Sequence, residues 1–116
     1  MKPLFVYLST CDTCKKILAT LPKEAIELQD IKKKPVTAEQ LDAWVKKTGS
    51  YEALFSKRSQ LYKQRNLKDV VLSESDYREL ILEHYTFLKR PVLVIGEKVW
   101  VGNTPEVQQA MQNAFK

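Results

Sequence analysis

The sequence predicts an α/β protein with a mixed sheet of about four strands and helices packed on it. The first observation is a continuous apolar run over residues 3–8, which is typical of a strand buried on both faces. The second is a pair of apolar runs at 91–95 and 98–101, which predicts an antiparallel hairpin. Helical patterns fill most of the chain between these strands. A sheet with parallel and antiparallel strands, covered by helices, is the simplest way to bury all these faces.

The first third of the chain predicts a β-α-β start. After the strand at 3–8, a helix over residues 12–21 ends before Pro22, because proline cannot continue a helix. The alternation over 25–28 predicts a second strand. The charged segment 30–35 then predicts a connector rather than a regular element.

The next part of the chain is predicted to be helical. Thr37 and Gln40 form a capping box at the start of a helix that ends near Gly49. Two short amphipathic pieces follow, at 51–55 and 59–64. We therefore expect several helices, the first of them well capped, before the hairpin.

A longer helix is predicted from Ser73, with an apolar stripe that faces a core. The stripe has spacings of three and four residues and consists of Tyr77, Leu80, Ile81, His84, Tyr85 and Leu88. A lone histidine on an apolar face is most often a packing residue. His84 is therefore expected to have a structural role.

The C-terminal part predicts a hairpin and a last helix. The turn between the strands at 91–95 and 98–101 falls at Gly96-Glu97. Thr104 is the expected N-cap of the last helix and Pro105 its first residue. The residues that point inward are Val107, Ala110, Met111, Ala114 and Phe115.

Length, composition and charge narrow the class of protein. A chain of 116 residues with 44% hydrophobic residues is expected to form one domain, residues 1–116. It has no membrane-spanning run and no secretory signal, which predicts a cytoplasmic protein without a membrane role. The net charge is +5, but the basic residues are scattered, with local groups at 32–34 and 57–65. Direct nucleic-acid binding is therefore not expected.

Two cysteines, Cys11 and Cys14, lie one helical turn apart, directly after the first strand and at the start of the first helix. Unpaired N–H groups and the helix dipole at that position stabilise a thiolate, so Cys11 is the expected nucleophile and Cys14 the resolving thiol. In a reducing compartment such a pair is catalytic, redox-sensing or metal-binding. A structural zinc site needs about four ligands, and after these sulfurs only His84 remains. Neither a metal site nor a cofactor is predicted.

Three motifs in order along the chain resemble those of the arsenate reductase ArsC/Spx family. They are Tyr7-Leu8-Ser9-Thr10-Cys11-Asp12-Thr13-Cys14, Phe55-Ser56-Lys57-Arg58-Ser59, and Leu88-Lys89-Arg90-Pro91 followed by Val101-Gly102. The resemblance implies a thioredoxin-like fold with a helical insertion over about 37–88. It also implies a cis peptide bond before Pro91, facing the active-site cysteine.

The resemblance assigns the site residues. Cys11 matches the family's nucleophile, Arg58 and Arg90 match two arginines of its anion site, and Pro91 completes the expected substrate-binding set. A guanidinium beside a thiolate stabilises it and can hold a tetrahedral oxyanion such as arsenate or phosphate. The expected catalytic residues are Cys11, Cys14 and Arg90.

The chain also departs from the single-cysteine arsenate reductases of the family. Those enzymes use glutathione as external thiol, whereas Cys14 is a built-in resolving thiol. Their third arginine is replaced here by Val101-Gly102-Asn103, and their histidine four residues before the cysteine is replaced by Tyr7. The C-x-x-C pattern and the glycine after the hairpin are closer to Spx, a redox-sensing regulator that binds the RNA polymerase α subunit.

Two function classes remain open. One is a thiol-disulfide oxidoreductase that acts on a small oxyanion or a disulfide and is reduced by thioredoxin or by a glutathione/glutaredoxin system. The other is an Spx-like regulator whose disulfide changes its affinity for RNA polymerase. Spx-type binding depends on a loop glycine before the middle arginine. Here Ser50, next to Gly49, falls in register with that glycine, which favours the enzyme.

Overall fold

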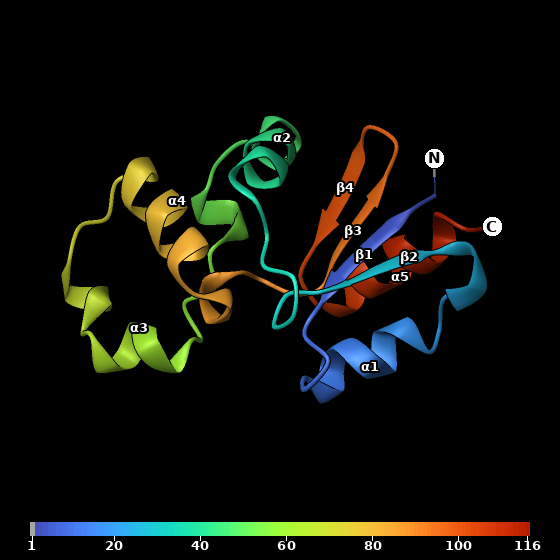
Figure 1. Cartoon of the computed structure of the whole chain (residues 1–116), viewed down its shortest axis with the longest axis horizontal. Helices are drawn as coiled ribbons and strands as arrows, with labels where there is room; N and C mark the ends of the chain where they lie inside the picture. Colours follow the sequence, from blue (N-terminus) through green and yellow to red (C-terminus); the bar gives the residue numbers. More distant parts are fainter. Residues whose placement is uncertain (1) are drawn as a thin grey trace. The chain divides into compact units, whose positions relative to one another are not determined.

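In the computed structural model, which describes residues 2–116, the chain forms two compact units. The strand unit runs up to Lys34 and resumes from Arg90 to Lys116, and the helical unit comprises Pro35–Lys89. Figure 1 shows that all four strands belong to the first unit and that α2, α3 and α4 belong to the second. In the sequence, the helical unit thus lies between β2 and β3.

A single four-stranded sheet forms the frame of the strand unit. Its strands are β1 (Leu4–Tyr7), β2 (Glu27–Asp30), β3 (Val92–Ile95) and β4 (Lys98–Val101). Their order is β2-β1-β3-β4, with β1 parallel to β2 and antiparallel to β3, and β3 antiparallel to β4. The predicted α/β class with a mixed sheet of about four strands is therefore confirmed. The apolar strands β1 and β3 are central, as continuous hydrophobic runs require.

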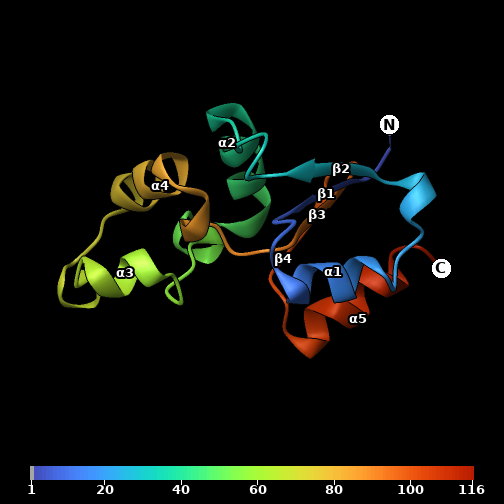
Figure 2. The same ribbon diagram turned by 60° about the horizontal axis from the view of Figure 1, so that its bottom comes forward.

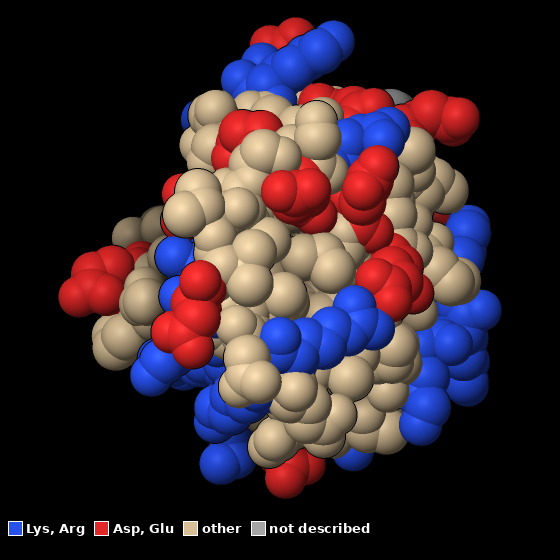
Figure 3. All heavy atoms as spheres, turned by 90° about the vertical axis from the view of Figure 1, so that its left-hand side faces the viewer, with Lys and Arg blue, Asp and Glu red and all other residues tan. Residues whose placement is uncertain are grey.

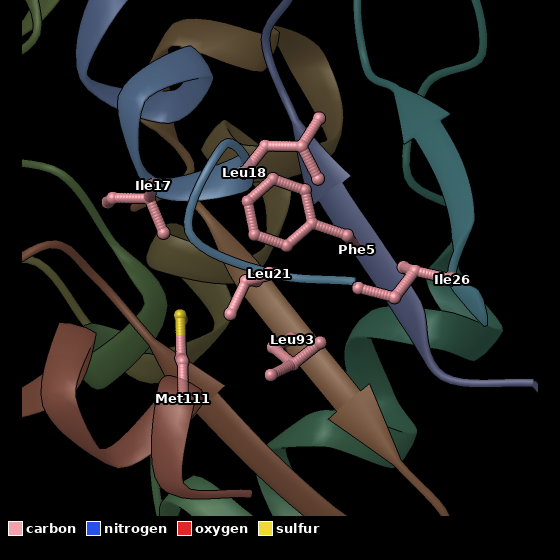
Figure 4. Close-up of a cluster of buried hydrophobic side chains, with 7 residues drawn as sticks. All are labelled: Phe5, Ile17, Leu18, Leu21, Ile26, Leu93 and Met111. Carbon is pink, nitrogen blue, oxygen red and sulfur yellow. The ribbon is translucent and has the colours of Figure 1, made fainter. Parts of the chain in front are cut away.

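Two helices, α1 (Asp12–Leu18) and α5 (Pro105–Asn113), pack beside one another against the sheet, as Figure 2 shows. The core between the helices and the sheet contains Phe5, Ile17, Leu18, Leu21, Ile26, Leu93 and Met111 (Figure 4). Phe5 and Leu93 are register partners on β1 and β3 and point to the same face. This core fixes the end of β1 from which the cysteine turn leaves the sheet.

Two predicted boundaries in the strand unit were wrong. Helix α1 ends at Leu18 rather than residue 21, because the Thr20 hydroxyl and N–H both donate to the Ile17 carbonyl and close a tight turn. Strand β2 covers Glu27–Asp30 rather than 25–28. A 3₁₀ turn at Lys23–Ala25 delays it, and pairing with β1 carries it on to Asp30.

The helical unit contains α2 (Ala38–Thr48), α3 (Gln60–Gln64) and α4 (Glu74–Glu83), joined by short 3₁₀ turns. The capping box of α2 is confirmed: the Gln40 N–H donates to Thr37 Oγ1 at 3.0 Å, and the Thr37 N–H donates to Gln40 Oε1 at 3.1 Å. Gly49 closes α2 with a φ of 93°, a left-handed conformation that glycine adopts at low cost.

An aromatic cluster around Phe55 forms part of the core of the helical unit. The Phe55 ring stacks on Phe87 at 5.4 Å between centroids and lies 4.9 Å from Tyr77. The predicted long helix through Leu88 was wrong, because α4 ends at Glu83. Residues 85–87 form a 3₁₀ turn instead, which lets Phe87 and Lys89 pair with the backbone of Ser56 and Leu54 at 2.7 and 2.8 Å. His84 has the expected structural role, since its Nδ1 accepts the Thr86 N–H at 3.1 Å.

The surface carries charges of both signs. Figure 3, a view of one face, shows acidic and basic side chains interspersed among other residues. Ion pairs in the helical unit include Lys57–Glu52, Arg65–Glu83 and Arg78–Asp42. Among residues 2–116, no helix combines the length and the apolar character needed to cross a bilayer.

Candidate active site

Cys11 lies at the junction of a tight turn and a helix in the strand unit. After β1 the chain turns over four residues, and the Cys11 N–H donates to the Leu8 carbonyl at 2.9 Å. Cys11 is the N-cap of α1, and its carbonyl accepts the Lys15 N–H at 3.2 Å. The side chain of Cys11 is partly exposed. The local sequence thus places a reachable thiol beside the N–H groups at the start of a helix.

Cys14 lies one turn further along α1 and is fully buried, with 0% of its surface exposed. Burial disfavours its thiolate and raises the pKa of Cys14 to about 12, although a backbone hydrogen bond from Leu8 acts in the opposite direction. The neighbouring Cys11 sulfur adds to the increase, because two adjacent thiolates repel one another. Neither cysteine is in a disulfide, and Cys14 is therefore a protonated thiol at neutral pH.

The environment of Cys11 has the opposite effect on its thiol. Partial burial alone would raise the pKa of Cys11, whereas hydrogen bonds from the backbone and side chain of Cys14 lower it. The positive charge of Arg90 and a hydrogen bond from its side chain lower the pKa further. The net result is a pKa below the ordinary value. The pKa of Cys11 is thus lowered and that of Cys14 is raised. A nucleophile and its resolving thiol require this difference.

Arg90 lies two residues before strand β3, and its side chain interacts with Cys11 from there. The Arg90–Pro91 peptide bond is cis, as the family resemblance predicted, and Pro91 is buried. The Gly102 N–H donates to the Pro91 carbonyl at 2.9 Å, and Asn103 Nδ2 donates to the Arg90 carbonyl at 3.3 Å. Asn103 therefore holds the Arg90 backbone from the segment that follows β4. No local sequence pattern reveals that contact.

The structure brings three of the predicted site residues together in the strand unit, and a fourth belongs to the helical unit. Cys11, Cys14 and Arg90 interact within the strand unit. Arg58 belongs to the helical unit, where it is exposed just before α3. Its part in binding an oxyanion, like the substrate-binding role of Pro91, stays a prediction.

Asp30 contacts the turn that carries Cys11, which sequence reasoning missed. The sequence places it in a charged connector, whereas in the structure it is the last residue of β2. Its Oδ1 accepts the Ser9 N–H at 3.2 Å, within the turn that leads to Cys11. Only the pairing of β1 with β2 creates this contact, so no local signal could have identified it.

The described residues contain no group of three or more His, Cys, Asp and Glu side chains arranged to hold a metal ion. The groups that the structure brings together at the site are one thiol with a lowered pKa, one buried thiol and one guanidinium. This set is suited to nucleophilic attack on sulfur or on an oxyanion, followed by disulfide formation.

Comparison with known sequences gives consistent matches along almost the whole chain. The sequence model of the ArsC family matches residues 7–111. The Bacillus subtilis protein YusI is 31% identical over 107 residues, which cover 88% of this chain and 91% of that protein. An arsenate reductase of Haemophilus influenzae is 27% identical, with 83% and 86% covered. The global transcriptional regulator Spx 2 of Bacillus anthracis is 25% identical, with 93% and 86% covered.

A solved structure shows the same fold. The crystal structure of a protein described as ArsC family related, from Bacteroides fragilis, superimposes with a TM-score of 0.78 at 29% identity. The match covers 96% of this chain and 98% of the other. The thioredoxin-like arrangement of sheet and helices is thus shared over essentially the full length of both proteins.

Proposed function

This chain belongs to the ArsC family, and from that premise we propose that it is a thiol-dependent reductase with Cys11 as nucleophile and Cys14 as resolving thiol. The observation that carries the proposal is the contrast between the two sulfurs. Cys11 is partly exposed with a lowered pKa beside Arg90, whereas Cys14 is buried with a raised pKa. A pair with one thiolate and one protonated thiol reacts in a fixed order.

With a disulfide substrate, the Cys11 thiolate attacks one sulfur and forms a mixed disulfide, and the other substrate sulfur leaves as a thiolate. Cys14 then loses its proton, attacks the Cys11 sulfur and releases the second substrate thiol. Two electrons have passed from the cysteine pair to the substrate, and a Cys11–Cys14 disulfide remains. With arsenate the same two electrons reduce As(V) to As(III), and the oxygen removed leaves as water. Arg90 stabilises the attacking thiolate and the charge of the bound anion.

The cycle closes when an external thiol reduces the Cys11–Cys14 disulfide. We assign this step to thioredoxin or to a glutathione/glutaredoxin system in the cytoplasm, on the basis of the family's chemistry. We also retain the proposal that the whole chain is one thioredoxin-like domain that carries a helical insertion over about 37–88.

An Spx-like regulator is the second candidate, because the Bacillus anthracis regulator aligns over 93% of this chain. In that role the same disulfide would change the affinity for the RNA polymerase α subunit. The loop before Arg58 favours the enzyme. Gly49 is committed to closing α2, and the Ser50 hydroxyl accepts the Ala53 N–H at 3.1 Å. A pull-down with purified α subunit separates the two: binding that depends on the disulfide supports the regulator.

The test of the enzyme proposal is the pH dependence of Cys11 alkylation in a Cys14→Ser background, which keeps the backbone N–H and a hydroxyl beside Cys11. We expect a pKa clearly below the ordinary value of about 8.5. Arg90→Ala in the same background should raise that pKa and slow alkylation at neutral pH about tenfold, because a pKa change of about one unit is tenfold in thiolate. Arg90→Lys, which keeps the charge without the fork of donors, should fall between them. An ordinary pKa in the parent would exclude both the reductase and the redox regulator.

A further inference from the structure

The turn between β1 and α1 determines where the Cys11 thiol lies. It spans Leu8 to Cys11 and is closed by the Cys11 N–H donating to the Leu8 carbonyl at 2.9 Å. Strand pairing stops before this turn, since the β1–β2 ladder ends at Tyr7 paired with Asp30. The N–H of Ser9, inside the turn, therefore has no strand partner. A bond that fixes the position of Ser9 therefore also fixes the backbone that leads to Cys11.

The carboxylate of Asp30 holds Ser9. Its Oδ1 accepts the Ser9 N–H at 3.2 Å and the Lys32 N–H at 3.2 Å. Burial by itself would raise the pKa of Asp30, but hydrogen bonds from Ser9 and from the Lys32 backbone, together with the charge of Lys33, lower it overall. One carboxylate thus joins the turn after β1 to the turn after β2.

The backbone of Asp30 is itself rigidly fixed. Its carbonyl accepts the N–H groups of Lys33 and Lys34 at 3.0 and 2.8 Å. The next residue, Ile31, is buried, and its N–H donates to the Tyr7 carbonyl at 2.9 Å. A side chain on such a base loses little entropy when it forms its bonds, so it is an effective support for a neighbouring turn.

We propose that Asp30 is a positioning residue for the nucleophile: by accepting the Ser9 N–H, its carboxylate holds the Leu8–Cys11 turn so that the Cys11 thiol meets the Cys14 N–H and Arg90. This inference rests on the proposed function of Cys11. Asp30 does not touch the sulfur, and it acts through the turn. Its negative charge would by itself disfavour a thiolate nearby, so loss of the charge and loss of the acceptor have opposite effects on Cys11.

The test uses the full chain with Cys14→Ser, in which the pH profile of Cys11 alkylation by iodoacetamide is measured for three further variants. Asp30→Ala removes the acceptor and should raise the Cys11 pKa and slow alkylation at neutral pH about tenfold, since small displacements of a reacting group have large effects on rate. Asp30→Asn keeps an oxygen acceptor without the charge. Its alkylation rate should stay within about twofold of the parent, because the turn is not displaced. Asp30→Glu keeps the charge but displaces the carboxylate, and should slow the reaction. It replaces Asp30→Ala if that variant does not fold.

The matched control is Asp76→Ala in the helical unit. The Asp76 carboxylate also accepts a serine N–H, that of Ser73, at 2.9 Å. It should lower the free energy of unfolding by a similar amount without changing the Cys11 profile. Unchanged alkylation in Asp30→Ala or Asp30→Glu, or equal loss in Asp30→Asn and Asp30→Ala, overturns the inference while the proposed function stands. An ordinary Cys11 pKa in the parent overturns both.

Discussion

The strand unit and the helical unit are stabilised in different ways. In the strand unit a paired sheet and an aliphatic core around Phe5, Leu93 and Met111 support the cysteine turn. In the helical unit the aromatic cluster around Phe55 is accompanied by ion pairs on the surface, such as Asp42–Arg78. Apolar burial involves no titratable charge, whereas exposed ion pairs depend on pH and are screened by salt. The two cysteines thus lie in the unit whose frame is a paired sheet and an apolar core.

The two tryptophans allow this difference to be measured. Trp44 is a buried residue of α2 in the helical unit, and Trp100 is a residue of β4 in the strand unit. A variant that keeps only Trp44, through Trp100→Phe, reports on the helical unit by fluorescence. The reciprocal variant, Trp44→Phe, reports on the strand unit.

The largest expected effect comes from removing one aromatic ring from either core. Phe5→Ala and Phe55→Ala should each lower the free energy of unfolding by about 3–5 kcal/mol, because each leaves a cavity in a fully packed site. In urea titrations we expect the tryptophan of the affected unit to show the larger shift. Equal shifts of both reporters for both substitutions would mean that the units unfold as one, and would contradict the comparison.

The next effect is a loss of stability at alkaline pH that belongs to the strand unit. The pKa of Cys14 is raised to about 12 in the folded chain, against about 8.5 when unfolded. Between these values the unfolded thiol loses its proton and the folded thiol keeps it, so the free energy of unfolding falls as pH rises. The decrease is about 1.4 kcal/mol per pH unit, or about 2 kcal/mol from about pH 8.5 to about pH 10.

The lowered pKa of Cys11 has the opposite sign: its contribution grows as pH rises towards the unfolded value of about 8.5 and levels off above it. The measurement is urea unfolding of the reduced protein, followed by Trp100, at several pH values. Cys14→Ala is the control and should lack the decrease. If both proteins lose stability equally, the buried thiol is not the cause.

The smallest effect is expected in acid and belongs to the helical unit. Hydrogen bonds from Arg78 and Tyr51 lower the pKa of Asp42 to about 2, so its stabilising contribution is present above the unfolded value of about 3.9 and is lost as pH falls toward about 2. Acid titration should therefore shift the Trp44 signal before the Trp100 signal. Asp42→Asn should remove the pH dependence of Trp44 in this window, and an identical acid profile in parent and variant would exclude the ion pair as its source.

Much of the fold follows from local patterns. The capping box at Thr37, the Gly96 turn and the N-cap at Thr104 all appear where the sequence predicts them. These signals are short-range, because a cap or a turn depends on residues within four positions of each other. The placement of Cys11 at a helix start is predictable for the same reason.

The ends of elements were less predictable because distant partners determine them. Helix α4 has an apolar stripe that continues past Glu83, yet the chain leaves the helix so that Phe87 can stack on Phe55. Strand β2 runs to Asp30, a charged residue, because β1 supplies the hydrogen bonds. In both cases tertiary pairing outweighs local propensity.

The sequence by itself determined the order of the elements and the position of the cysteine pair at a helix start, and from that local pattern it predicted a nucleophile and a resolving thiol. The family resemblance added Arg90 as a candidate. Only the tertiary structure decided that Arg90 and Asp30 act on the same turn, one through its charge on Cys11 and the other through the Ser9 N–H. The physical reason is that the folded sheet brings the ends of β1 and β2 and the start of β3 together, and no short-range pattern encodes contacts between residues so far apart in the chain.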